Sequence, residues 1–138
     1  LVKKYGKSIK YSYGQQEGSC GVFVYRITMT NEDGISVEYS WNDVKKRCKE
    51  LGLKTVPEFD LYIAPEFDIT EDFLTTHLKN LSESKSSTLD STHPMEGVCA
   101  RVENENGVNI FKYKTWDFKF LEGIVKDNDA YVDVEEVS

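Results

Sequence analysis

One carboxylate and two ammonium groups are spaced in a way that could hold a phosphate. Glu96 opens a short apolar run that ends at Arg101, and Lys112 and Lys114 lie two residues apart in the next apolar run. Because side chains alternate between the two faces of a strand, an antiparallel hairpin would place both lysines on one face. The carboxylate would attract a divalent cation, and the lysines would neutralise phosphate oxygens. The alternative is an ordinary solvated hairpin, on which the same pattern is common.

The composition indicates a single folded domain over residues 1–138. Hydrophobic residues make up 39% of the chain and aromatic residues 12%, which is typical of a globular protein with one core. The apolar runs are shorter than a membrane span requires, and no signal-peptide pattern opens the chain. We therefore expect a cytoplasmic protein without membrane contact. The chain begins with leucine, which we interpret as the start of a fragment.

Cysteine spacing and net charge limit the possible partners. The three cysteines, Cys20, Cys48 and Cys99, are widely spaced and form no Cys-x-x-Cys motif. This pattern argues against a zinc site or a disulfide framework, so we expect reduced thiols. The formal net charge of −7 differs from the basic surface of most nucleic-acid binders. Contact with a polynucleotide would need a local basic cluster, or a binding surface outside this chain.

The first half of the chain predicts a hairpin followed by a helix. Residues 22–27, Val-Phe-Val-Tyr-Arg-Ile, are rich in β-forming types and predict a strand. Residues 31–34 end in Asp-Gly, a hairpin turn signal, and apolar and polar residues alternate over 35–39 as in a return strand. A helix is then predicted, with Asn42 as its N-cap and Gly52 at its end.

The second half predicts a strand over 59–63, a helix capped by Thr70, and the Glu96 hairpin. His77 lies on the apolar face of that helix, so we interpret it as a packed or rim histidine. Residues 82–93 are rich in serine and polar, and we expect a mobile linker within the domain. An apolar cluster near the C-terminus should dock on the sheet, Lys119 could extend the positive face, and the acidic tail should be peripheral. The cluster comprises Trp116, Phe118, Phe120 and Leu121, and the tail residues 127–136.

Three segments resemble motifs of the covalent nucleotidyltransferases, the ATP-dependent RNA and DNA ligases, and most closely phage-type RNA ligases. They are Glu96-Gly97-Val98-x-x-Arg101, Phe111-Lys112-Tyr113-Lys114 and the tail Phe118-Lys119-Phe120-Leu121-Glu122-Gly123. The similarity extends from about residue 6 to residue 122. It implies an α+β fold, a partial ATP-grasp-like ligase core in which a twisted, mostly antiparallel sheet carries two or more helices.

The resemblance also implies roles for individual residues. Glu96 matches the glutamate that helps to place Mg²⁺ or Mn²⁺, and Lys112 and Lys114 match the paired lysines, of which one contacts the α-phosphate of ATP. Arg101 matches the arginine that closes the glutamate motif. Tyr25 stands where relatives have an aromatic residue that stacks on adenine, although Arg26 replaces their aspartate. Phe23 shares a strand face with Tyr25. The alternative for both residues is a position in the core, and we favour this alternative for Phe23.

The motif of the nucleophilic lysine, Lys-x-Asp-Gly, does not occur in this sequence. In the family that lysine attacks ATP to form lysyl-AMP, AMP moves to a 5′-phosphate, and a 3′-hydroxyl displaces it to seal the strand. Lys3-Lys4-Tyr5-Gly6 lacks the aspartate, and residues 6–11 resemble the stretch after the family's Gly-Glu motif. We therefore expect the nucleophile to lie upstream and this chain alone to be inactive.

The expected partners follow from this interpretation. They are a polynucleotide, RNA rather than DNA, and the missing N-terminal part of the same domain, with self-association of the fragment as another possibility. Two alternative functions remain open. One is a non-catalytic nucleotide- or nucleic-acid-binding module on a ligase scaffold, and the other is a capping-type guanylyltransferase.

Overall fold

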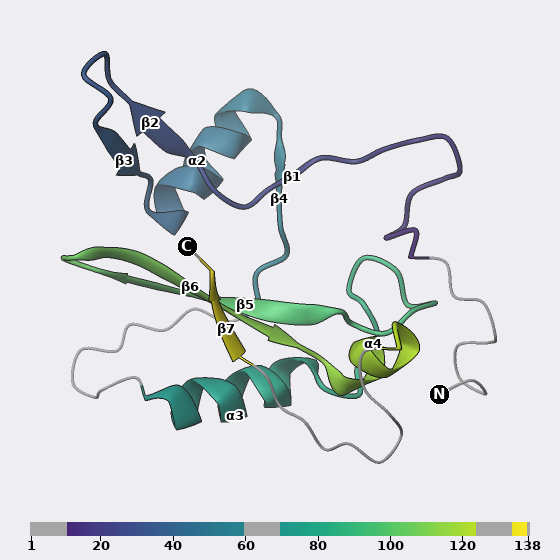
Figure 1. Ribbon diagram of the computed structural model, residues 1–138. Coiled ribbons are helices and arrows are strands. Elements are labelled where there is room, and N and C mark those ends of the chain that lie inside the picture. The colour runs from purple at the N-terminus through teal and green to yellow at the C-terminus, as the bar shows by residue number, and fades with distance from the viewer. Residues whose placement is uncertain (1–10, 60–69, 124–133, 138) are drawn as a thin grey trace.

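A computed structural model describes residues 11–59, 70–123 and 134–137 of the chain (Figure 1). These residues form an α+β fold, as expected, in which most strand pairs are antiparallel. The elements in chain order are β1 (Phe23–Val24), β2 (Thr28–Thr30), β3 (Ser36–Glu38), α2 (Trp41–Leu51), β4 (Lys54–Thr55), α3 (Glu71–Ser82), β5 (Gly97–Asn104), β6 (Gly107–Lys114), α4 (Trp116–Leu121) and β7 (Val134–Val137).

The long hairpin β5–β6 lies at the centre of the molecule. Its antiparallel register pairs Val98 with Tyr113, and α3 packs against the face that these two side chains share. Leu78 of α3, Val98 and Tyr113 form the buried apolar cluster. In Figure 1, α3 lies on one side of the hairpin, and α2 with strands β1 to β4 lies on the other. The hairpin is therefore the middle layer, with one face committed to the core.

Of the strand predicted over 22–27, only Phe23–Val24 form a strand, β1, which pairs in parallel with β4. The next strand, β2, begins just after the predicted run and pairs antiparallel with β3. The short length of β1 has a tertiary cause, since its partner follows α2 in the sequence. The backbone N–H of Val56, just after β4, donates to the carbonyl of Val24 at 3.0 Å.

Helix α2 begins two residues earlier than predicted. Ser40, not Asn42, is the N-cap, and its hydroxyl accepts a hydrogen bond from the backbone N–H of Asp43 at 3.2 Å. The prediction of Asn42 was wrong because serine and asparagine both cap helices well, and residue type alone does not decide between neighbouring positions. Gly52 ends the helix as predicted, with a positive φ of 69° that glycine tolerates. Thr70 caps α3 as predicted, accepting from the N–H of Phe73.

The segment that follows α3 folds back towards the hairpin. The N–H of Met95 donates to the carbonyl of Lys85 at 2.8 Å, and the N–H of Ser87 donates to the carbonyl of His93 at 3.0 Å. Asp90 accepts hydrogen bonds from the Ser12 hydroxyl at 2.5 Å and the Gly14 N–H at 3.3 Å. Hydrogen bonds thus connect residues 82–93 to neighbouring segments. The mobility of these residues stays a prediction.

Strand β7 comes from the acidic tail that was expected to be peripheral. It pairs antiparallel with the outer edge of β6, giving the strand order β5-β6-β7. The edge of β6 offers backbone N–H and C=O groups that need partners, which explains why a tail of unremarkable composition can add a strand. The predicted strand over 59–63 lies, apart from Phe59, outside the described residues. Among the helices that the structure describes, none is long and apolar enough to cross a membrane.

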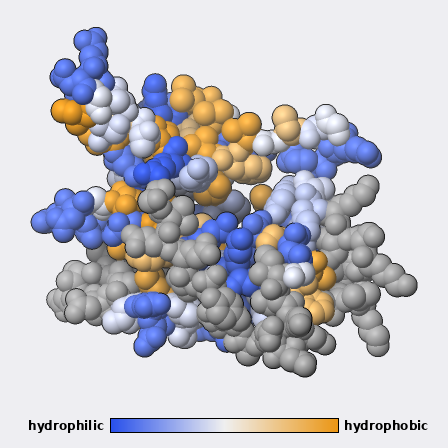
Figure 2. All heavy atoms as spheres, in the orientation of Figure 1, coloured by the Kyte–Doolittle hydropathy of each residue, from blue (hydrophilic) through white to orange (hydrophobic). Residues whose placement is uncertain are grey.

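Several large apolar side chains remain on the surface of the layer that contains α2. Figure 2 shows hydrophobic surface gathered over the part of the molecule where α2, β1 and β4 lie. Such a concentration marks a surface that contacts another segment or another protein. The exposed residues of this layer, termed here the apolar surface, are Val22, Tyr25, Met29, Ile35, Val37, Leu51 and Leu53.

Candidate functional site

The hairpin brings the two predicted lysines to one face. Lys112 lies directly opposite Cys99 and Lys114 directly opposite Gly97, and paired residues of antiparallel strands point to the same side. This is the face opposite to the one that packs on α3, and both lysines are half-buried. The alternation in the sequence therefore predicted their common face correctly.

Glu96 lies at the start of the same hairpin. Its backbone carbonyl accepts from the N–H of Thr115 at 2.9 Å, which continues the ladder by one residue. Its half-buried side chain accepts a hydrogen bond from the phenol of Tyr13, with 2.8 Å between Oη of Tyr13 and Oε2 of Glu96. The N-terminal segment is thus bound to the mouth of the hairpin.

The Cys99 thiol responds to two opposite charges, Lys112 directly across the hairpin and Glu96 just before β5. Burial around the sulfur raises the pKa of the Cys99 thiol, the Lys112 ammonium lowers it, and the Glu96 carboxylate raises it. Both charged groups therefore lie near enough to act on one sulfur atom. A carboxylate and an ammonium group in one neighbourhood have the charges that suit a cation and an anionic oxygen.

The two aromatic candidates lie in another layer. Phe23 is half-buried in β1, whereas Tyr25, just after β1, is 65% exposed. Within the described part of the chain, no hydrogen bond, ion pair or ring contact connects either ring to Glu96, Lys112 or Lys114. Tyr25 has the exposure that a base-stacking residue needs, and Phe23 has the partial burial of a core residue. Their role in adenine binding stays a prediction.

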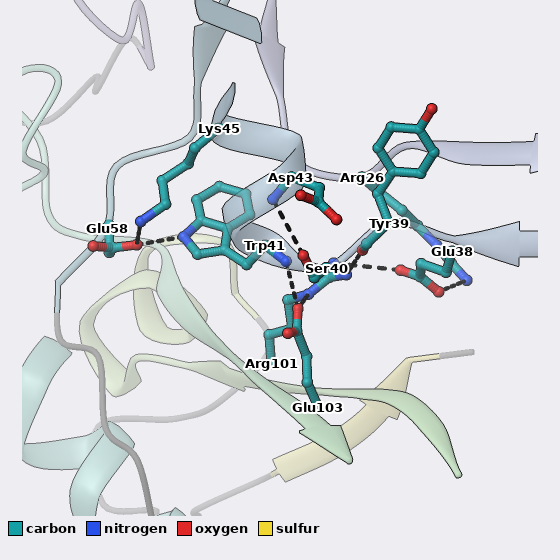
Figure 3. Close-up of polar contacts among 10 residues, drawn as sticks. All are labelled: Arg26, Glu38, Tyr39, Ser40, Trp41, Asp43, Lys45, Glu58, Arg101 and Glu103. Atoms are coloured by element: carbon teal, nitrogen blue, oxygen red, sulfur yellow. Dashed lines mark hydrogen bonds and ion pairs between the residues drawn. The ribbon is translucent and has the colours of Figure 1, made fainter. Parts of the chain in front are cut away.

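Arg101 connects β5 to the layer above it (Figure 3). Its guanidinium donates to the carbonyl of Tyr39 at 2.5 Å and forms ion pairs with Glu103 at 2.7 Å and with Glu38 at 3.3 Å. Glu103 in turn accepts from the N–H of Trp41 at 2.6 Å. The resemblance matches Arg101 to the arginine that closes the glutamate motif, and the nucleotide contact that this match implies stays a prediction. The structural role of Arg101 is to link β5 to Glu38. No local sequence pattern connects these two residues.

Replacing Arg101 with methionine should destabilise the chain by about 2 kcal/mol, because hydrogen bonds to a charged group are lost and Glu38 stays behind. The side chains of Arg101 and Glu38 are only 14% and 16% exposed, so solvent compensates poorly. Urea denaturation measures the free energy of unfolding. The matched control is Arg26→Met, which also removes an ion pair to Glu38 but at a residue 37% exposed, and should cost less than about 1 kcal/mol. Equal losses would contradict the junction role of Arg101.

A metal ion would find one carboxylate at this site. Among residues 11–59, 70–123 and 134–137, no three His, Cys, Asp or Glu side chains come together to hold a metal. Mg²⁺ is commonly bound by one or two carboxylates together with substrate phosphates and water. The half-buried Glu96 fits that mode, as a single protein group beside a phosphate, and does not fit a closed protein cage.

Four aromatic side chains behind Glu96 form a cluster that the sequence analysis did not identify. Tyr11 and Tyr13 both meet the fully buried ring of His93 edge to face, at centroid distances of 5.3 and 4.8 Å. Tyr11 also contacts Phe118 of α4 at 5.6 Å. The Tyr-x-Tyr alternation was visible in the sequence, but its partners lie about eighty residues away, as the 83-residue separation between Tyr13 and Glu96 illustrates.

Comparison with known protein families points to the same part of the chain. Comparisons with curated proteins and with solved structures found no match. A family model described as RNA ligase matches residues 4–114, which is most of the chain and includes Glu96, Arg101, Lys112 and Lys114. The chain therefore belongs to the RNA ligase family.

Proposed function

We propose that this chain is the C-terminal part of the adenylyltransferase domain of an ATP-dependent RNA ligase of the phage type, with a partial ATP-grasp-like core. The complete enzyme would join a 5′-phosphate to a 3′-hydroxyl through lysyl-AMP and an adenylylated strand. Membership of the RNA ligase family supports the general role. The observation that carries the specific proposal is the common face of Lys112 and Lys114 on a hairpin that Glu96 opens.

The chain's own residues would act on the phosphate and on the base. The ammonium groups of Lys112 and Lys114 would neutralise charge that develops on the α-phosphate oxygens during both AMP transfers. Bound Mg²⁺ or Mn²⁺ would supply further charge neutralisation, and Glu96 would be its protein contact. Tyr25 would stack on adenine, and Phe23 and Arg101 would support the nucleotide contact.

The nucleophile in this proposal lies in residues upstream of Leu1, within a longer parent protein. The absence of Lys-x-Asp-Gly from the sequence supports this assignment. The apolar surface supports it as well, because seven large apolar residues there lack cover in the described structure. The upstream part of the same domain would cover this surface, and without it the chain would self-associate.

Labelling with α-³²P-ATP and Mg²⁺, followed by a denaturing gel, tests the proposal. The parent protein should retain a covalent label, whereas residues 1–138 alone should not, because they lack the attacking lysine. A label on Lys3 or Lys4 of the isolated chain would overturn the assignment of the nucleophile. Preferential labelling by GTP would point to the capping-type guanylyltransferase instead. Sealing assays with nicked RNA and nicked DNA would then identify the substrate.

The second candidate function is a non-catalytic binding module on the ligase scaffold. The missing nucleophile motif and the net charge of −7 favour it. Equilibrium binding of ATP to the parent protein discriminates between the two, because this module would bind the nucleotide without becoming labelled.

A further inference from the structure

We propose that Tyr13 is a positioning residue that fixes the Glu96 carboxylate, so that one carboxylate oxygen is held by the protein and the other is presented to the metal or its water. This inference rests on the proposed function of Glu96. It adds a residue from the N-terminal segment to the phosphate and metal part of the site, whose other members lie in or directly before the β5–β6 hairpin. The phenol acts through Glu96 and does not itself contact the nucleotide.

The contact between the two side chains is direct. Oη of Tyr13 donates to Oε2 of Glu96 at 2.8 Å, and Oε1 of Glu96 accepts no hydrogen bond from the described residues. A carboxylate that is bonded at one oxygen has a fixed rotation, which is how an outer partner orients a ligand.

The backbone around Tyr13 is itself held in place. Tyr13 has a positive φ of 50°, which is uncommon for a tyrosine, and Gly14 follows with a φ of 78°. The N–H of Gly14 donates to Asp90, and Ser12 donates to the same carboxylate oxygen. A Cβ on Gly14 would lie 2.7 Å from the carbonyl oxygen of Leu89. The turn is thus bonded on both sides of Tyr13 to the loop that leads into Glu96.

The ring of Tyr13 has a rigid support. It meets His93 at a centroid distance of 4.8 Å, and His93 is fully buried three residues before Glu96. Tyr11 contacts the same histidine, but after burial it is Glu122, more than Glu96, that raises the pKa of the Tyr11 phenol. The two tyrosines therefore belong to one aromatic cluster. The carboxylate that acts most strongly on the phenol is Glu96 for Tyr13 and Glu122 for Tyr11. This difference provides a matched control.

The experiment compares four variants of the parent protein by Mn²⁺ binding, measured by electron paramagnetic resonance in the presence of α,β-methylene-ATP. Glu96→Gln should weaken Mn²⁺ binding by about tenfold or more, and Tyr13→Phe by about tenfold, as losing an outer partner of a ligand does. Tyr11→Phe should stay within about twofold of wild type, because it removes a hydroxyl from the same cluster without touching Glu96. In the double variant, Tyr13→Phe should add nothing to Glu96→Gln, since the two residues act as a unit.

Each outcome has one meaning. Two results together support the inference. Mn²⁺ binding weakens in Tyr13→Phe and not in Tyr11→Phe, and the double variant binds Mn²⁺ as well as Glu96→Gln does. Unchanged binding in Tyr13→Phe while Glu96→Gln is impaired overturns the inference and leaves the proposed function intact. Equal losses in both tyrosine variants overturn it too, because the cluster as a whole would then be responsible. Full Mn²⁺ binding by Glu96→Gln removes the metal role of Glu96, and the inference with it.

Discussion

Replacing either Lys112 or Lys114 with alanine should slow AMP transfer by the parent protein by about 100-fold or more, the usual effect of removing one preorganised charge at a reacting phosphate. The two ammonium groups lie on the same face of β6, opposite Cys99 and Gly97. A half-buried position makes the loss larger than at a fully solvated site, because water replaces the missing charge poorly. Arginine at either position should restore part of the activity, since it keeps the charge but changes the geometry.

Two separate assays identify the step that each lysine serves. Labelling by α-³²P-ATP follows the formation of lysyl-AMP, and transfer from labelled protein to 5′-phosphate RNA follows the second step. The matched control is Lys46→Ala on the exposed side of α2, which should stay within about twofold of wild type in both assays. If both Lys112→Ala and Lys114→Ala behaved like this control, the phosphate role of the hairpin face would be wrong.

The hairpin was predictable from sequence because one of its faces is committed to the core. Val98 and Tyr113 must both face α3, and a shift of one residue would turn every side chain of the strand over. The position of Lys112 and Lys114 on the other face follows from that constraint. The same reasoning holds for α3, which Thr70 caps as predicted and which buries Leu74 and Leu78 on one face.

Features that depend on distant partners were not predictable in the same way. The run 22–27 looks like one strand locally, yet only Phe23–Val24 form β1, and β2 begins after the run. These two strands pair with segments that lie on either side of α2. Propensity cannot reveal such a division, because it results from tertiary pairing. The bond from Tyr13 to Glu96 and the ion pair from Arg101 to Glu38 join residues 83 and 63 positions apart, and neither leaves a local pattern. The residues that hold the site in place are therefore harder to read from sequence than those that carry its charge.

Replacing Gly97 with alanine should destabilise the chain by about 3 kcal/mol, at the upper end of the cost of forcing extra atoms into a packed interior. A Cβ at this position would lie 2.0 Å from the carbonyl oxygen of Tyr113 and 3.1 Å from Cα of Lys114. Both neighbours are backbone atoms of β6, so neither can move without opening the ladder between the strands. Urea denaturation of residues 1–138 measures the effect as a loss in the free energy of unfolding.

Gly21→Ala is the matched control for this prediction. Its Cβ would meet the side chain of Gln15 at 2.9 Å, and the end of a flexible side chain can move away at little cost, below about 0.5 kcal/mol. Because Gly97 is the first residue of β5, follows Glu96 and pairs with Lys114, its replacement should also slow AMP transfer by the parent protein at temperatures where the fold persists. Equal stability of the two glycine variants would mean that β5 and β6 do not approach as closely as described. The glutamate and the lysines would then lack the fixed spacing on which phosphate binding depends.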